Sequence, residues 1–337
     1  MGPLRLRARR ETEEDFEGKR ARMEGTSRHR TEPQTSIHGS GGVSRREFLR
    51  LSGLTAFSVA GVGFLAACGP ASQGTSSGSD GSDSSGSGSE VLGDGKTMRV
   101  GMEAAYAPYN WQATESSDTT IPIQNVDGAY ADGYDVQIAK KIADKLGMDP
   151  VAVKMNFSGL IDALNNGQID IICAGMSATE ERRKSIDFSD AYFTGGFGLL
   201  VQKGSKYASA TSLEDFSGAS VLGQKDTNLD YIIDDIPGVN HLTPVDSVPA
   251  QFSQLTQGTC DAITFNTENT KGILKAYPDL VVVPFAEGKG FTEVATVNAG
   301  LKKGQDKILA KVNEVIDAIS DDEKQKLWND CMDRQPS

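Results

Sequence analysis

In the middle of the chain the spacing of apolar residues alternates between the period of strands and the period of helices. Dense apolar residues in 97–103, 151–156 and 169–176 predict three strands, the last apolar enough for burial on both faces. Helical spacing over 133–147 and 158–167 predicts two helices between them. This alternation favours a mainly parallel sheet covered by helices.

Both predicted helices carry capping signals. Gly147 follows the first helix, where glycine readily adopts the left-handed conformation of a C-cap. Ser158 is the candidate N-cap of the second. The apolar face of the first helix is formed by Val136, Ala139, Ile142, Ala143 and Leu146.

A second series of the same kind follows. Strands are predicted at 219–224, 260–266 and 280–285, and helices at 227–236, 248–258 and 268–276. Residues 306–331 have apolar positions in helical register, which predicts one or two amphipathic helices. The two series predict two α/β lobes with a ligand cleft between them, because open α/β sheets bind ligands beyond the carboxyl ends of their strands.

The chain crosses between the predicted lobes twice. We expect lobe one to comprise residues 96–194 and, after the second crossing, 294–337, with lobe two formed by 195–293. The two crossings are extended segments and are expected to act as the hinge of a clamp that closes on its ligand.

The residues before this fold have a different character. Residues 44–50 (SRREFLR) resemble the twin-arginine export signal, and the uncharged stretch 51–67 has the pattern of a signal peptide's hydrophobic core. That stretch is shorter than the about 20 apolar residues of a membrane span. Residues 1–43 lack apolar periodicity, so we interpret them as a disordered extension or as sequence upstream of the true start, with Met23 as the candidate start.

The signal sequence ends in Leu65-Ala66-Ala67-Cys68, which resembles the lipobox of bacterial lipoproteins, where the cysteine becomes the lipidated first residue of the mature chain. Residues 69–95 are rich in Gly, Ser and Asp and predict a flexible tether. Together these segments predict an exported protein that is lipid-anchored through Cys68 to the outer face of the cytoplasmic membrane.

Charge is distributed unevenly along the chain. The net charge is −12, of which residues 1–68 contribute +4 and the remainder −16. Such an acidic mature part argues against binding to nucleic acid or to anionic lipid head groups.

Cysteine and histidine usage limits the chemistry. Cys173, Cys260 and Cys331 lack metal-ligand spacing, and a single disulfide between residues 260 and 331 or 173 and 331 stays open. Histidine occurs only at positions 29, 38 and 241, so a histidine-based zinc site or catalytic triad is nearly excluded from the folded part. We expect no metal, no cofactor and no catalytic residue.

Polar residues are concentrated after the third predicted strand. Ser177 to Arg182 lie beyond the carboxyl end of 169–176 and enter a helix, with Thr179 as the N-cap and Glu180 and Glu181 in the first turn. Amides at a helix start bind anions, and an arginine there adds a two-pronged hydrogen bond to a carboxylate. The alternative is an ordinary solvated, capped helix start.

The span from about Met98 to Leu327 resembles the family 3 extracellular solute-binding proteins of ABC importers, whose usual ligands are amino acids. The matching segments are RVGMEAAYAPYNW, GYDVQIAKKIADKLG, NFSGLIDALNNGQIDIICAGMSATEERRKSIDFSDAYF, GTCDAITFN and GLKKGQDKILAKVNEV. Glutamine- and histidine-type binding proteins are the most similar of them. The resemblance implies the two-lobe type II periplasmic-binding-protein fold, an ABC permease as the membrane partner, and a monomer.

The resemblance also implies a set of ligand-binding residues. In lobe one these are Arg182 and Ser177 for the α-carboxylate, Ala174 and Gly175 near the α-amine, Tyr106 and Phe157 as an aromatic sandwich, and Glu103 at the amine or side chain. In lobe two they are Gln224, Thr227 and Asn228, in a loop after a strand, and Asn266 at the end of another strand. Core packing is the alternative for the two aromatic residues, and a solvated turn is the alternative for the lobe-two loop.

Asn266 departs from the family, which commonly has Asp at this position to bind the ligand's ammonium. A neutral amide accepts a hydrogen bond but does not compensate the charge. Either Glu268 or Glu103 therefore supplies the negative charge, or the ligand is not a standard zwitterionic amino acid. At position 224 the family commonly has Lys or another residue that contacts the ligand's side chain. Gln224 can both donate and accept, which favours a neutral polar ligand such as glutamine, whereas Glu103 would tolerate a ligand with a basic side chain.

Two other functions remain open from the sequence. Some proteins of this fold are exported dehydratases, but Glu103 is the sole strong acid–base candidate in the cleft. A ligand sensor that signals to a membrane receptor needs the same closing cleft as a transport protein.

Overall fold

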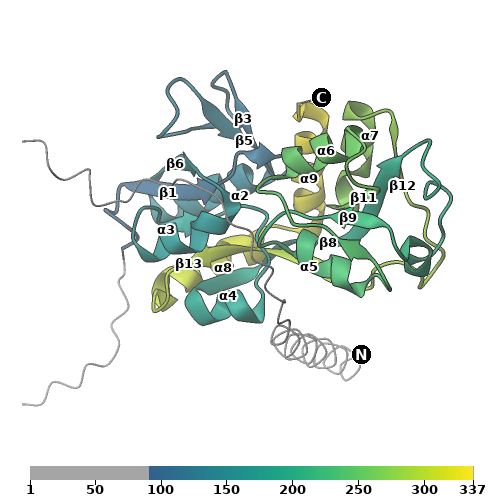
Figure 1. Ribbon diagram of the computed structural model, residues 1–337. Coiled ribbons are helices and arrows are strands. Elements are labelled where there is room, and N and C mark those ends of the chain that lie inside the picture. Colours follow the sequence, from purple (N-terminus) through teal and green to yellow (C-terminus); the bar gives the residue numbers. More distant parts are fainter. Residues whose placement is uncertain (1–90, 337) are drawn as a thin grey trace, which may run out of the picture. The chain divides into compact units, whose positions relative to one another are not determined.

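The computed structural model describes residues 91–336, all within one compact unit (Figure 1). The extension, the twin-arginine signal, the lipobox Cys68 and most of the tether lie outside the described residues. Of the range predicted as a tether, Leu92 is instead part of the fold, since it is 2% exposed and packs in the core of lobe one. Within residues 91–336, every helix is too short or too polar to cross a membrane.

Lobe one is built around a central parallel strand, as the sequence predicts. β1 (Thr97–Met102) pairs in parallel with β6 (Asp149–Lys154) on one side and β7 (Ile171–Ile172) on the other. The amphipathic helix α2 (Tyr134–Leu146) and the shorter α3 (Leu160–Asn165) contact these strands. Their apolar side chains form a single buried cluster.

Lobe two repeats this arrangement. β9 (Ser220–Leu222) pairs in parallel with β10 (Asn240–His241) and β11 (Ala262–Asn266). Its helical segments are η2 (Leu213–Phe216), α5 (Asn228–Tyr231), η3 (Ile232–Asp235), α6 (Val248–Thr256), η4 (Thr267–Asn269) and α7 (Thr270–Ala276). Its apolar side chains form clusters separate from that of lobe one.

Two long strands join the lobes (Figure 1). β8 (Asp187–Gln202) pairs antiparallel with β13 (Val294–Leu301) along its first part, and with β11 and β12 (Leu280–Val282) along its second. The result is one nine-stranded sheet that runs through both lobes. The mainly parallel sheet predicted for the first series is found in β1, β6 and β7. The sheet becomes mixed at β8 and β13, which cross between the lobes in extended form, and at β12, all of which pair antiparallel.

Lobe one also carries a small sheet and the C-terminal helices. The small sheet consists of β2 (Ala105–Tyr106), β3 (Asn110–Ala113), β4 (Ile121–Pro122) and β5 (Tyr130–Asp132), all antiparallel. The predicted C-terminal helical segment is two helices, α8 (Asp306–Ala318) and α9 (Asp321–Arg334). Both bury apolar side chains in the lobe-one core.

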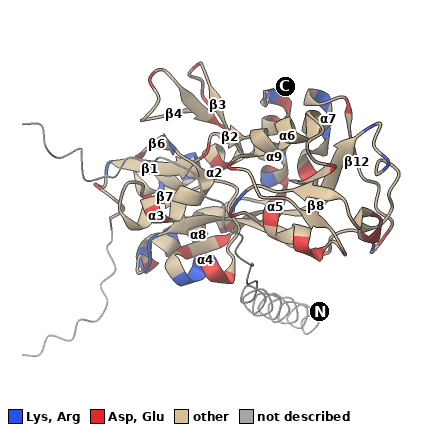
Figure 2. Cartoon of the chain, viewed as in Figure 1, with Lys and Arg blue, Asp and Glu red and all other residues tan. Residues whose placement is uncertain are grey.

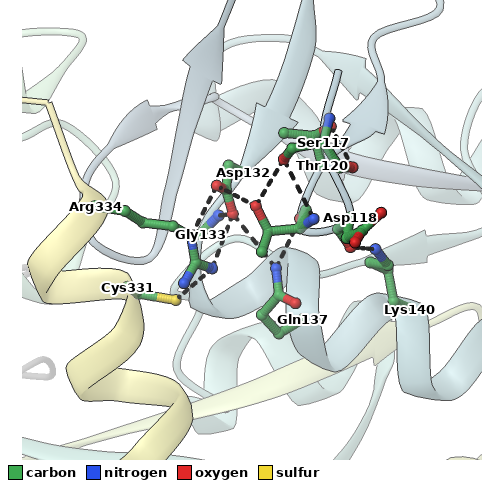
Figure 3. Close-up of polar contacts among 10 residues, drawn as sticks. Ser117, Asp118, Thr120, Asp132, Gly133, Gln137, Lys140, Cys331 and Arg334 are labelled. Atoms are coloured by element: carbon green, nitrogen blue, oxygen red, sulfur yellow. Dashed lines mark hydrogen bonds and ion pairs between the residues drawn. The ribbon is translucent and has the colours of Figure 1, made fainter. Parts of the chain in front are cut away.

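The end of α9 is fixed to lobe one by a polar network (Figure 3). Arg334 donates from Nε and Nη2 to the two carboxylate oxygens of Asp132, at 2.9 and 3.0 Å. The same carboxylate accepts from the Thr119 hydroxyl and the backbone N–H of Gly133. This bidentate ion pair holds α9 against lobe one, where Trp328 stacks on Phe193 of β8 with ring centroids 4.2 Å apart.

The capping predictions have mixed outcomes. Gly147 is the left-handed C-cap of α2, and Thr179 caps α4 (Glu180–Ser185) by accepting from the N–H of Arg182. Ser158 is not a cap, because the one-turn η1 (Phe157–Gly159) precedes α3 and Ser158 lies inside it.

The strand predicted at 169–176 is also too long. Only Ile171 and Ile172 form β7, since the chain leaves the sheet at Gly175, which has a left-handed φ of 62°. Cys173, Cys260 and Cys331 are free and buried, so neither disulfide considered from the sequence is formed.

Candidate functional site

A small enclosed cavity lies where the carboxyl ends of strands from both lobes meet. Glu103 follows β1, Ala174 follows β7, Gln224 follows β9, and Asn266 ends β11. The cavity is lined by all eleven residues predicted to bind ligand: Glu103, Tyr106, Phe157, Ala174, Gly175, Ser177, Arg182, Gln224, Thr227, Asn228 and Asn266. Its volume is about 30 Å³.

Five further residues line the cavity and were not predicted from the sequence. They are Tyr109, Phe197, Leu229, Ala295 and Val297. Three of them belong to the crossing strands: Phe197 of β8 pairs with Asn266 of β11, and Ala295 and Val297 lie where β13 pairs with β8. Tyr109 stacks on Tyr106 with ring centroids 4.8 Å apart, so a second aromatic ring supports the predicted one.

Arg182 is a buried cation whose hydrogen bonds go to neutral acceptors. It is 9% exposed, and its Nη1 and Nη2 donate to the carbonyl oxygens of Ser177 and Asp226, at 2.8 and 2.7 Å. Its guanidinium carbon lies 5.1 Å from the ring centroid of Phe157. Burial lowers the pKa of Arg182 to about 10, so it stays charged at neutral pH. A buried cation of this kind is suited to binding a carboxylate.

Glu103 and Gln224 meet across the cavity. Gln224 Nε2 donates to both carboxylate oxygens of Glu103, at 3.0 Å each, and the two side chains are 7% and 2% exposed. Burial raises the pKa of Glu103, while the bonds from Gln224 and from the Phe157 backbone N–H partly oppose that shift. The pair presents a carboxylate and an amide to one region of the cavity.

Asn266 also bonds to a residue of the other lobe. The Tyr106 hydroxyl donates to Asn266 Oδ1. Glu268, two residues further on, does not line the cavity: its Oε1 accepts from the backbone N–H of Gly196 in β8, at 2.8 Å. Of the two carboxylates considered from the sequence as compensation for the neutral Asn266, Glu103 alone reaches the cavity.

The lobe-two loop that contains Gln224, Thr227 and Asn228 is held by hydrogen bonds, and Gln224 and Thr227 are buried. It is therefore not the solvated turn considered as its alternative. The Thr227 hydroxyl caps α5 and donates to the Gln224 carbonyl oxygen at 2.7 Å. Asn228 lines the cavity, and its Oδ1 is buried without a hydrogen-bond partner among residues 91–336. An unsatisfied buried acceptor costs free energy, so this oxygen is suited to accepting from a ligand donor.

A histidine holds the end of the α5–η3 segment, which Figure 2 shows to be acidic. His241 lies between two carboxylates, with Nε2 and Nδ1 each 2.8 Å from Oδ1 of Asp230 and of Asp234. These bonds raise the pKa of His241 to about 9. The protonated ring can donate to both carboxylates, whereas the neutral ring has only one N–H.

We expect His241→Gln to lower the free energy of unfolding by about 1 to 2 kcal/mol at pH 6, because the half-buried charged pairs are lost. The pKa is raised on folding, so this stabilisation is complete below pH 6.5 and disappears as the pH rises through 9. Urea unfolding of both proteins at pH 6 and pH 10 measures the difference. An equal difference at the two pH values would contradict the protonated pairing.

The arrangement has the chemistry of a binding site for a small polar molecule. It combines one buried cation, one buried carboxylate, amide groups and aromatic rings, as expected of sites that orient a ligand through a few polar groups. Among the residues that the structure describes, no group of three or more His, Cys, Asp and Glu side chains is placed to hold a metal ion.

Known proteins are similar to this chain in sequence and in fold. The chain is 34% identical over 203 residues to the ABC transporter glutamine-binding protein GlnH of Bacillus subtilis, covering 59% of this chain and 72% of that protein. It is 31% identical over 229 residues to a probable histidine-binding protein of Campylobacter jejuni, covering 68% and 78%.

Among solved structures, the L-arginine-bound substrate-binding protein AbpA of an amino acid ABC transporter from Streptococcus pneumoniae has a TM-score of 0.61 at 25% identity. The match covers 70% of this chain and 94% of that one. Residues 98–330 match the bacterial extracellular solute-binding proteins, family 3. This chain belongs to that family.

Proposed function

We propose that this protein is the extracytoplasmic substrate-binding component of an ABC importer, and that its cleft binds a polar L-amino acid for delivery to a membrane permease. The observation that carries the proposal is the buried guanidinium of Arg182, whose hydrogen bonds within residues 91–336 go to carbonyl oxygens. It lines the same cavity as the buried Glu103–Gln224 pair. The ligands named for the relatives, among them glutamine, histidine and arginine, support it.

Each end of an amino acid has suitable partners. Arg182 and Ser177 bind the α-carboxylate, and the backbone groups of Ala174 and Gly175 contact the α-amine together with Asn266. Glu103 and Gln224 bind the ligand's side chain, while Tyr106 and Phe157 enclose it between aromatic rings. Thr227 and Asn228 close on it from lobe two.

Binding requires the lobes to separate and close again. In this arrangement the polar groups that would contact an amino acid are already engaged. Cavity groups of the two lobes bond to each other, at Glu103–Gln224, Arg182–Asp226 and Tyr106–Asn266. A ligand that replaces these bonds from both sides favours the closed form, which the permease recognises.

The location of the protein follows from the residues before the fold. We infer export by the twin-arginine route and lipid anchoring at Cys68, with residues from 69 onward as a tether to a monomeric binding domain.

A thermal-shift screen against the standard L-amino acids tests the function. At a thousandfold excess over Kd, a bound ligand adds about 4 kcal/mol, which raises the Tm of a domain of this size by about 10 °C. We expect such a shift from one or a few polar amino acids and none from their decarboxylated or deaminated analogues. Stabilisation by deaminated acids, or by no member of the panel, would refute the assignment to amino acids.

A further inference from the structure

Behind the cavity wall lies a carboxylate, Asp135, that the binding scheme above does not use. It is fully buried in the first turn of α2, and its hydrogen-bond donors are all neutral. The Tyr192 hydroxyl donates to Oδ1 at 2.6 Å, and Asn110 Nδ2 donates to Oδ2 at 2.7 Å. The backbone N–H of Gly175 also bonds to this carboxylate.

These bonds connect Asp135 to both lobe-one segments that line the cavity. Gly175 belongs to the segment of Ala174 and Ser177, and it is bonded directly. The other segment, from Glu103 to Tyr106, is reached through Asn110, whose Oδ1 accepts from the N–H of Ala104 at 2.9 Å. The buried carboxylate of Asp135 is therefore connected to the backbone beside the residues that are predicted to bind the carboxylate, the amine and the side chain of the ligand.

The segment from Glu103 to Tyr106 needs such support because it contains a left-handed residue with a Cβ. Ala104 has a φ of 50°, which is costly for a residue with a Cβ, and Gly175 has a φ of 62°. Conformations of this kind persist where surrounding bonds determine them. The bonds that run from Asp135 through Asn110 to Ala104 provide that determination.

The charge of Asp135 also reaches the cavity. After the larger effect of burial, its field raises the pKa of the cavity-lining Tyr106 more than those of Glu103 and Glu268 do. It also raises the pKa of Tyr109, there after burial and the smaller effects of Tyr106 and Glu268. The other titratable groups that interact with it are Tyr134, Tyr192, Cys173 and Cys331, none of them cationic. Burial without a cation raises the pKa of Asp135 to about 7.

We propose that Asp135 is a positioning residue of the binding site, which holds the two lobe-one segments in their ligand-binding conformation and supplies through the cavity wall the negative charge that the neutral Asn266 lacks. The inference rests on the proposed amino-acid-binding function. It explains how a site with an amide at the usual acidic position still attracts an ammonium group.

The hydrogen-bond chain gives a sharp test because it has a direction. It runs from the Ala104 N–H to Asn110 Oδ1, and from Asn110 Nδ2 to Asp135 Oδ2. Asp135→Asn removes the charge and can turn an N–H₂ group toward that of Asn110. Adding Asn110→Asp restores the donor–acceptor pairs between Ala104, residue 110 and residue 135, and places the negative charge on the residue that is bonded to the Ala104 N–H, next to Glu103.

Isothermal titration calorimetry with L-glutamine and L-arginine, from pH 6 to pH 8, compares the three proteins. We expect Asp135→Asn to weaken binding 10- to 100-fold at pH 8, and the double variant to recover most of that loss. Wild-type affinity should fall as the pH drops below 7, because protonation of Asp135 removes its charge, and this fall should be absent in Asp135→Asn. Glu103 is the same in both proteins, so a difference between their pH profiles belongs to Asp135.

The outcomes separate this inference from the proposed function. If the wild type binds the amino acid and Asp135→Asn binds it with the same affinity and pH profile, the inference is overturned and the proposed function stands. A folded Asp135→Asn protein that has lost affinity but keeps the wild-type pH dependence also overturns it, since the role is then only structural. Failure of the wild type to bind either amino acid overturns the function and the inference together.

Discussion

Arg182→Ala should abolish measurable amino-acid binding while the protein stays folded. The substitution removes the buried cation and both of its hydrogen-bonding arms. Charge-assisted hydrogen bonds are worth about 1.5 to 3 kcal/mol each, so the loss of two weakens binding by about 100-fold to 10,000-fold. Isothermal titration calorimetry measures the loss, and thermal unfolding checks the fold.

The neighbouring arginine provides a matched control. Arg183 lies on the same short helix but is exposed and packs over Phe188, away from the cavity lining. Arg183→Ala should therefore bind as the wild type does. Arg182→Lys keeps the charge but not the planar two-pronged geometry, so we expect an intermediate affinity. Near-normal binding by Arg182→Ala would mean that the ligand carboxylate is bound elsewhere.

The cavity lining was predicted from two sources. The local pattern indicated Ser177 to Arg182, and the family resemblance implied the other residues, which lie at strand ends in both lobes. Each predicted residue lies within a few positions of a strand or a helix cap, and the order of strands and helices is legible from apolar spacing. The Thr179 cap places Arg182 in the first turn of α4, so the local pattern already located the cation. Parallel strands then bring such segments together at one edge of a sheet.

What the sequence did not predict depends on pairing between distant segments. The strands of the small sheet are two to four residues long and have no readable period. Phe197, Ala295 and Val297 line the cavity because β8 pairs with β11 and β13 pairs with β8. The extent of β7 was overestimated because an apolar run continues where the backbone turns at Gly175.

Asp135 shows a different limit. An aspartate in the first turn of a helix is ordinarily a solvated partner of the helix dipole, and nothing in the local pattern distinguishes this one. Its burial arises from Tyr192 and Asn110, which lie 57 and 25 residues away in the chain. A charged group in such surroundings is identified only from the fold.

The lipid anchor can be tested independently of the ligand. Cys68→Ser should move the protein from the membrane fraction to the soluble fraction, because each buried CH₂ of an acyl chain contributes about 0.8 kcal/mol to membrane binding and the variant has none. The chain after Cys68 carries a net charge of −16, which gives it no attraction to anionic lipids. Fractionation with an alkaline wash and detection of the protein in each fraction measures the change.

A second cysteine substitution shows whether the effect belongs to position 68. Cys260 is buried in lobe two and has no role in anchoring, so Cys260→Ser should stay with the membrane. Retention of Cys68→Ser after the alkaline wash would refute the lipobox assignment and leave the stretch 51–67 as the anchor. If Cys68→Ser is released, Cys260→Ser is retained, and Cys68→Ser still binds the amino acid normally, then the fold binds its ligand without the lipid. The role of the lipid would then be to keep the domain beside its permease.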